Sequence, residues 1–185
     1  MRVQFLFLFV FTNLIFSQNS PFLDKISSEK IIYTEKKIHA DMMNNIYYLS
    51  GSELSKNKNL FFSDFSLGDI SNVDLFNPLK LKLWYKDYNT MVVLDNFLNE
   101  IVRVNFNNLN DPNEISHVST SNDNTMWVFD QLSMKIKKFD YIENSFVKGI
   151  EVLLKENIID MNSNYNFLWV LTKNNFYMIN YNGTI

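Results

Sequence analysis

Chemistry at neutral pH would most readily involve the two histidines of this sequence, His39 and His117, because the pKa of imidazole lies close to that range. Neither belongs to a recognisable metal triad. Asp64, Asp69 and Asp74 are regularly spaced, but the sequence around them lacks the D-x-D-x-D pattern and central glycine of a calcium loop. The chain contains no cysteine, and therefore no thiol nucleophile or cysteine-based zinc site. We therefore expect no metal, no cofactor and no assignable catalytic residue.

The best candidates for binding lie in one aromatic segment. Trp84 and Tyr85 are adjacent, and in an alternating strand one of two adjacent side chains must face outward. We predict that they form an exposed binding rim with Asp87 and Tyr88. His117 is added as a candidate because it lies in a strand predicted to line a channel. Two simpler interpretations stay open, core packing for the tryptophan and turn capping for the aspartate.

Composition narrows the possible partners. With 185 residues, 46% of them hydrophobic and 16% aromatic, the chain can bury a core. The formal charge of −3, with no stripe of lysine or arginine, disfavours nucleic acid or an anionic membrane as the partner. Four glycines are few for an all-β protein, so asparagine, aspartate and serine must supply the turn chemistry.

The segment Leu79–Phe106 indicates the elements that must position the candidate residues. Its pattern predicts three strands joined by polar turns, over Leu79–Tyr85, Met91–Leu94 and Ile101–Phe106. Similar units recur along the chain, each with an asparagine, one variable residue, four apolar residues and a polar residue. They begin 45, 35 and 42 residues apart, at Asn44, Asn89, Asn124 and Asn166. These spacings are typical of propeller blades, each of which is a small antiparallel sheet.

We therefore predict an all-β fold, a β-propeller of four-stranded antiparallel blades with about four repeat units. A β-sandwich or irregular barrel is the alternative, although neither would require the units to match offset by offset. The last unit reaches Ile185 after its third strand, so we expect a ring that is incomplete at the C-terminus. In the alternative, a strand at Ile31–Tyr33 completes a closed ring. Trp127 and Trp169 share one offset and are predicted to be equivalent inter-blade packing positions.

The N-terminus has the features of a secretory signal peptide. Arg2 precedes the apolar run Val3–Phe16, and Ser17 precedes a polar stretch. We predict a signal peptide over 1–17, a propeller domain over 18–185 that is truncated or complete, and export to the periplasm, the outer membrane or the medium. The apolar run is shorter than the about 17 to 25 residues that span a bilayer, so no stable membrane span is expected after cleavage.

Several segments resemble a group of uncharacterised exported β-propeller proteins of Gram-negative bacteria. They are Val73–Leu81, Tyr85–Asn89, Leu94–Asn96, Asn99–Ile101, Ser121–Asn124, Trp127–Phe129, Tyr165–Asn166 and Trp169–Thr172. The resemblance covers Ile70–Ile185. It implies a propeller fold and an export route, and it implies no activity, because none is assigned to the group.

These features favour an exported, non-catalytic β-propeller that binds a protein or glycan partner. One alternative is a structural component of the cell envelope. An enzyme, such as a hydrolase or lyase with its site in the channel, is less favoured. It would need acids such as Asp74 or Asp87 to converge with His117, and the sequence contains no nucleophile elbow, Walker loop or H-E-x-x-H motif.

Overall fold

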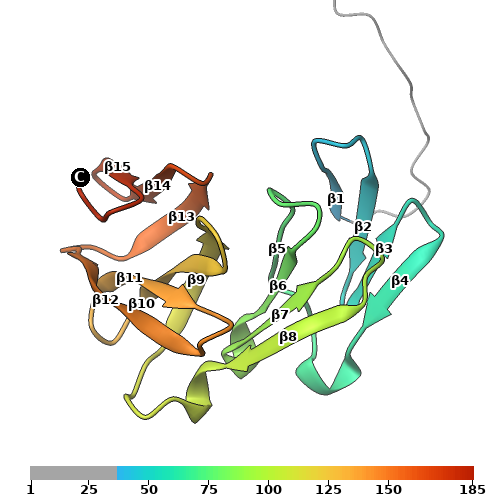
Figure 1. Cartoon of the computed structure of the whole chain (residues 1–185), viewed down its shortest axis with the longest axis horizontal. Coiled ribbons are helices and arrows are strands. Elements are labelled where there is room, and N and C mark those ends of the chain that lie inside the picture. The colour runs from blue at the N-terminus through green and yellow to red at the C-terminus, as the bar shows by residue number, and fades with distance from the viewer. Residues whose placement is uncertain (1–36) are drawn as a thin grey trace, which may run out of the picture. The chain divides into compact units, whose positions relative to one another are not determined.

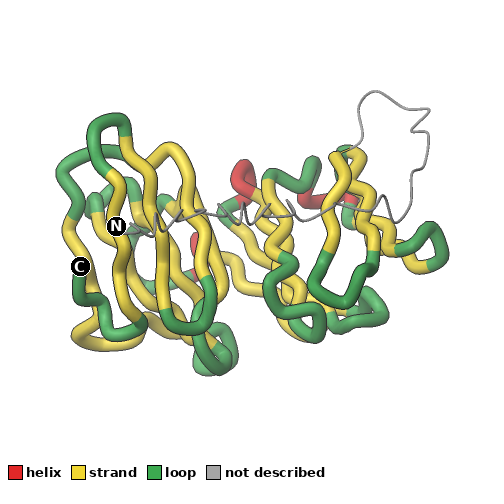
Figure 2. The backbone as a smooth tube through the Cα atoms, turned by 90° about the horizontal axis from the view of Figure 1, so that it is seen from above, coloured by secondary structure: helices red, strands yellow, loops and turns green. Residues whose placement is uncertain are grey.

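The computed structural model describes residues 37–185, which form an all-β structure (Figure 1). The predicted signal peptide over 1–17 and the apolar patch Ile31–Tyr33 lie outside the described residues. Helix among the described residues is confined to three short 3₁₀ turns, η1 (Phe65–Leu67), η2 (Lys86–Tyr88) and η3 (Phe106–Asn108); Figure 2 shows helix in red. No helix in this part of the chain is long and apolar enough to cross a membrane.

The strands form four antiparallel sheets, each built from strands that follow one another along the chain. Blade 1 contains β1 (Lys37–Ala40), β2 (Ile46–Ser50), β3 (Glu53–Lys56) and β4 (Leu60–Ser63). Blade 2 contains β5 (Asn72–Asp74), β6 (Leu81–Tyr85), β7 (Thr90–Leu94) and β8 (Glu100–Asn105). Blade 3 contains β9 (Ile115–Thr120), β10 (Thr125–Asp130), β11 (Lys135–Asp140) and β12 (Ser145–Leu153). Blade 4 contains β13 (Ile158–Ser163), β14 (Phe167–Thr172) and β15 (Phe176–Asn180).

Asparagine and aspartate replace glycine in the turns, as the composition predicted. Asn44 and Asn89 adopt the left-handed conformation, with φ of 62° and 48°. Many turns are closed by a side-chain oxygen that accepts a hydrogen bond from the backbone N–H two residues later. This bond is made by Asp41, Asp64, Asp74, Asn77, Asp95, Asn105, Asp130, Asp140, Asn164 and Asn180. The chain can therefore build tight hairpins with four glycines in all.

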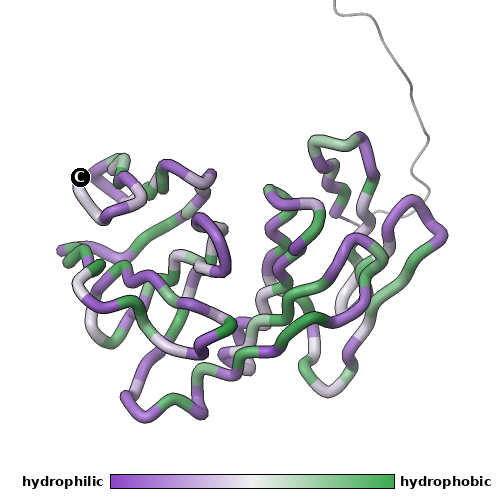
Figure 3. Tube along the Cα trace, viewed as in Figure 1, coloured by the Kyte–Doolittle hydropathy of each residue, from purple (hydrophilic) through white to green (hydrophobic). Residues whose placement is uncertain are grey.

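Three apolar clusters lie between consecutive blades, and Figure 3 shows the hydrophobic stretches that alternate with polar ones along the chain. Residues such as Tyr47, Leu83 and Tyr85 join blades 1 and 2. The cluster between blades 2 and 3 includes Trp84 and Phe106, and the cluster between blades 3 and 4 includes Trp127. Each inner blade therefore buries both faces of its sheet, which explains the nearly continuous apolar runs in β7 and β10.

This arrangement confirms the predicted all-β fold with propeller blades as its repeating unit. Each blade packs face to face on the next, and its first strand is a sheet edge that pairs only with the second strand. Blade 4 has three strands among the described residues. The expected incompleteness of the ring stays a prediction.

The repeat alignment is wrong by one strand in blade 2. The sequence pattern equated Met91–Leu94 with the second strands of blades 3 and 4, whereas β7 is the third strand of its sheet. The missed first strand is β5, which has three residues and one apolar side chain, Val73. Such a short strand has no alternation to detect, so β6 was counted as the first strand of the unit.

Candidate functional site

The structure buries the first two residues of the predicted rim. Trp84 is 2% exposed within the cluster between blades 2 and 3, and Tyr85 is fully buried on the opposite face of β6, against blade 1. Both neighbours find apolar surroundings because each face of blade 2 is covered by another blade. The predicted exposure of Trp84 and Tyr85 is therefore wrong, and core packing explains both. Trp84 Nε1 and the Tyr85 hydroxyl are buried without a hydrogen-bond partner.

Asp87 and Tyr88 are exposed, as predicted, in the turn η2 that joins β6 to β7. Asn89 ends this turn in the left-handed conformation, and the backbone oxygen of Tyr88 accepts a hydrogen bond from Asn107 Nδ2 at 3.2 Å. The turn is thus held in one position next to η3. Asp87 and Tyr88 remain candidate binding residues on this turn.

His117 and Trp84 line one small cavity of about 270 Å³, which we name the His117 cavity. The Ser116 hydroxyl lies 2.9 Å from His117 Nδ1, and Lys86 and Asp160 also line the space. Burial, and then the charge of Lys86, lower the pKa of His117, while Asp160 opposes the shift. His117 is therefore a neutral imidazole at pH 7. The His117 cavity thus brings together two of the five predicted binding residues, Trp84 and His117. Lys86 and Asp160 are the charged residues in its lining.

A larger cavity of about 480 Å³ lies along the first strands of all four blades, and we name it the inner cavity. Its lining residues are His39, Ala40, Asp41, Met42, Asn72, Val73, Asp74, Leu75, Phe76, Val118, Ser119, Asp160, Met161 and Asn162. Sequence reasoning missed this site because β5 was not recognised as a first strand. The signal that could have found it is the polar pattern of the first strands, which carry Asn, Asp and Ser where the second strands are apolar.

The charged residues that line the inner cavity are acidic. Asp41, Asp74 and Asp160 contribute carboxylates, and no lysine or arginine among residues 37–185 lines the space. Burial raises the pKa of Asp41, but hydrogen bonds from Asn45, Tyr47 and Met43 more than offset it, so the net shift is downward. His39 adds no compensating positive charge, because burial and then Lys37 lower its pKa. The inner cavity therefore suits a polar or positively charged group.

The carboxylates of the inner cavity differ in how fully they are engaged. Asp74 accepts hydrogen bonds from the N–H groups of Thr120 at 2.6 Å and Phe76 at 2.9 Å, which ties blade 2 to blade 3. Asp160 accepts one bond, from the N–H of Met161, and its side chain is exposed. Asp160 also lines the His117 cavity, so it is the carboxylate that both cavities share. It is the acid best placed to meet a ligand.

The arrangement that an enzyme was expected to show is not met. It required two or more acids within hydrogen-bond reach of His117, but Asp160 is the one acid that influences its pKa, and it does so through its charge. Asp74 lines the inner cavity and Asp87 lies in the turn η2, and neither affects the pKa of His117. Within residues 37–185, no group of three His, Asp or Glu side chains could hold a metal ion.

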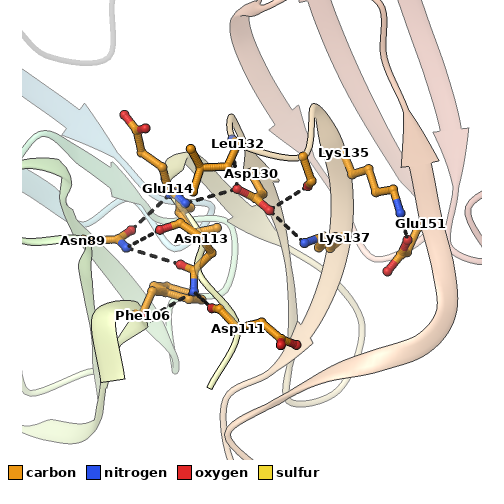
Figure 4. Close-up of polar contacts among 12 residues, drawn as sticks. Asn89, Phe106, Asp111, Asn113, Glu114, Asp130, Leu132, Lys135, Lys137 and Glu151 are labelled. Atoms are coloured by element: carbon orange, nitrogen blue, oxygen red, sulfur yellow. Dashed lines mark hydrogen bonds and ion pairs between the residues drawn. The ribbon is translucent and has the colours of Figure 1, made fainter. Parts of the chain in front are cut away.

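A polar network near β10 has a structural role (Figure 4). Asp130 accepts bonds from the N–H groups of Glu114 and Leu132, from Ser133 Oγ at 2.6 Å and from Lys137 Nζ at 2.8 Å. Asn89 bonds through its side chain to Asn113 and to the N–H of Ile115. The network fixes the segment that crosses from blade 2 to blade 3.

No family model matches the sequence, and comparison with curated proteins finds no match. Solved structures do match, and the likeness is one of fold. Virginiamycin B lyase from Staphylococcus aureus has a TM-score of 0.54 at 8% identity, with 77% of this chain and 51% of that chain covered. KlHsv2 with loop 6CD replaced by a Gly-Ser linker has a TM-score of 0.53 at 16% identity, covering 84% and 53%. BBS1N, solved in complex with ARL6DN, has a TM-score of 0.57 at 11% identity, covering 85% and 52%.

These comparisons agree with the β-propeller fold. The chain spans about half the length of the structures that it matches. At these identities the likeness carries no activity and no partner to this chain.

Proposed function

We propose that this chain is an exported, non-catalytic β-propeller module that binds a protein partner through the inner cavity. The observation that carries the proposal is the lining of that cavity, in which the described residues supply three carboxylates and no lysine or arginine. A basic side chain or short basic segment of a partner would find charge complementarity there. Burial lowers the pKa of His39, the histidine in this lining, so it adds no positive charge there at pH 7.

Two further observations support an interaction module over an enzyme. Among the described residues, Asp160 is the one acid whose charge affects the pKa of His117, whereas a channel enzyme would need two or more acids there. Propellers also serve as binding platforms elsewhere, since the similar BBS1N was solved with ARL6DN bound. Rigid sheets that expose loops at one end offer a broad surface for such recognition. The exposed Asp87 and Tyr88 remain candidate binding residues on the turn η2.

Site-specific crosslinking in the native host tests the proposal. A photoreactive amino acid at Met42, an exposed residue that lines the inner cavity, should crosslink to a defined protein, which mass spectrometry then identifies. The same group at Leu132, an exposed turn residue outside the cavity, is the matched control. Recovery of the adduct from the envelope fraction also tests export.

Charge provides the second arm of this experiment. Asp160→Asn should reduce crosslinking from Met42 because it removes the most accessible carboxylate, whereas Glu143→Gln on the surface should not. An adduct that forms equally from Met42 and Leu132, or that is insensitive to Asp160→Asn, would contradict binding at the inner cavity. Recovery from the cytosol alone would contradict export.

A further inference from the structure

The face of blade 4 that does not touch blade 3 is apolar and open. In β14, Leu168 and Val170 point into the cluster with blade 3, while Trp169 and its neighbours point the other way. The open face carries Phe167, Trp169, Leu171, Phe176 and Met178. Phe176 is 67% exposed, and Trp169 is half-buried. A contiguous row of large apolar side chains on a protein surface marks an interaction site.

Strand register identifies this open face as a blade-packing face. Trp127 pairs with Lys138 and Phe129 with Ile136, and these four residues of blade 3 face blade 4 or its edge. At the corresponding positions of blade 4, Trp169 pairs with Met178 and Leu171 with Phe176. In blade 2, Trp84 pairs with Met91 on the face that packs against blade 3. Three blades thus present a second-strand tryptophan toward the position of the following blade.

Blade 1 has an open face on the side of its sheet that points away from blade 2. Its sheet buries Tyr47, Leu49 and Leu54 against blade 2. Strand pairing places Ile38, Ile46 and Phe61 on the opposite face, and all three are exposed. Phe61 is 60% exposed. This is the face that an inner blade buries against the blade before it.

We propose that a second copy of this chain covers both open faces, with blade 4 of each copy packed against blade 1 of the other. The contact continues the packing already present between blades 3 and 4, where Trp127 is buried. Successive propeller blades are related by rotation about one axis. Two head-to-tail contacts between two copies therefore close a ring, whereas an open series of such contacts would grow into a filament.

Two observations favour a second copy as the occupant. The two open faces lie on the same chain, and both carry exposed apolar side chains. Two copies can therefore cover all four faces through two equivalent contacts. The solved propellers that the chain resembles are about twice as long, so two copies supply a similar amount of structure. The inference goes beyond the proposed function, because it concerns the apolar side chains of the two open faces, none of which lines the inner cavity. Asp160 and Asn162 lie at the border of the two sites, since they line the cavity and pair with Leu171 and Trp169.

The test measures the mass of the purified full chain by light scattering and sedimentation equilibrium over a range of concentrations. We expect twice the chain mass of 21.9 kDa. Trp169→Asp and Phe61→Asp should each raise the dissociation constant at least about 30-fold, the change expected for a hot-spot residue. Leu132→Asp, at an exposed turn away from both faces, should leave the dimer intact. Circular dichroism of each variant verifies that the monomer is folded.

Mixing the two variants distinguishes a dimer in which blade 4 meets blade 1 from one in which two like faces meet. Combined, Trp169→Asp and Phe61→Asp chains retain one unmodified pair of faces and should form a heterodimer that neither variant forms alone. A dimer disrupted by Trp169→Asp but not by Phe61→Asp would mean that two blade 4 faces meet, which overturns the proposal. A wild-type chain that stays monomeric also overturns it, and indicates that another segment, such as residues 1–36, or another protein covers the faces.

Discussion

Trp127 and Trp169 occupy the same position on the second strands of blades 3 and 4, yet their surroundings differ. Trp127 is 1% exposed in the cluster between the two blades, and its ring also receives Lys138 Nζ at 5.3 Å from the centroid. Trp169 is half-buried and contacts Phe167 on the open face. The two tryptophans therefore share a register and differ in whether a second sheet of the described residues packs on them.

The difference teaches that burial in this fold is decided between blades. Within each sheet, the pattern of second and third strands sets which side chains face the next blade. Whether those side chains are buried or exposed depends on the next sheet, which the local sequence does not reveal. The face of blade 3 that blade 4 covers and the open face of blade 4 thus have the same pattern of side chains, and they differ in whether another sheet covers them.

Removing the two tryptophans should produce the largest contrast. Trp127→Ala should lower the free energy of unfolding by about 3 to 5 kcal/mol, because it leaves a cavity among packed side chains. Trp169→Ala should cost the monomer about 1 kcal/mol, because much of its surface is already in water. Urea unfolding at low protein concentration measures both. Equal losses would mean that blade 4 is covered even in the monomer.

The next largest difference is expected between Asp130 in blade 3 and Thr172 in blade 4, in the stability lost when each side chain is removed. Asp130→Ala should cost about 3 kcal/mol, because it leaves Lys137 and two backbone N–H groups without their buried acceptor. Thr172 ends β14 at the aligned position and bonds only within its own turn, so Thr172→Ala should cost about 1 kcal/mol.

An exposed ion pair provides the control for the polar anchors. Lys135 Nζ lies 2.6 Å from Glu151 Oε2 on the surface of blade 3. Glu151→Gln should change the free energy of unfolding by less than about 1 kcal/mol. The same denaturation assay applies. If Asp130→Ala were as mild as Glu151→Gln, the network of Figure 4 would not anchor the crossover between blades 2 and 3.

The fold was largely predictable from local signals, and the site was not. Strand alternation, asparagine-rich turns and the repeat spacing identified the blades, because each signal lies within a few residues. The short strand β5 left no such signal, and the repeat units shifted by one strand as a result. Trp84 and Tyr85 appeared to be a rim because the sequence does not show that blade 2 is covered on both faces. The inner cavity depends on four strands far apart in sequence.

A buried lysine distinguishes the closed face of blade 3 from the open face of blade 4. Burial lowers the pKa of Lys138, with Asp123 opposing the shift, and Met178 occupies the corresponding position of blade 4. Between the lowered pKa and about 10.4, the unfolded chain binds more protons, so stability rises with pH. Wild type should therefore gain stability relative to Lys138→Met as the pH rises toward about 10.4. Parallel pH profiles of the two proteins would exclude the burial of this charge.

The smallest expected effect is a loss of stability below neutral pH that comes from His39 and His117. Burial, followed by nearby lysines, lowers the pKa of both His39 and His117. Below about pH 6.5 the unfolded chain takes up protons first, so the folded state loses stability as the pH falls. Urea midpoints at about pH 7.5 and 5.5 should differ in wild type and converge in the His39→Gln, His117→Gln double variant. A double variant as pH-sensitive as wild type would assign the effect to other groups.

Hydrogen–deuterium exchange at two protein concentrations tests the central comparison most directly. If the open face of blade 4 is a blade-packing surface awaiting its partner, exchange in β14, β15 and the strands of blade 1 should slow as concentration rises. Exchange in β10 and β11, whose face is already covered by blade 4, should not change. Rates in blades 1 and 4 that are independent of concentration would contradict the account, because the open faces would then be ordinary surface.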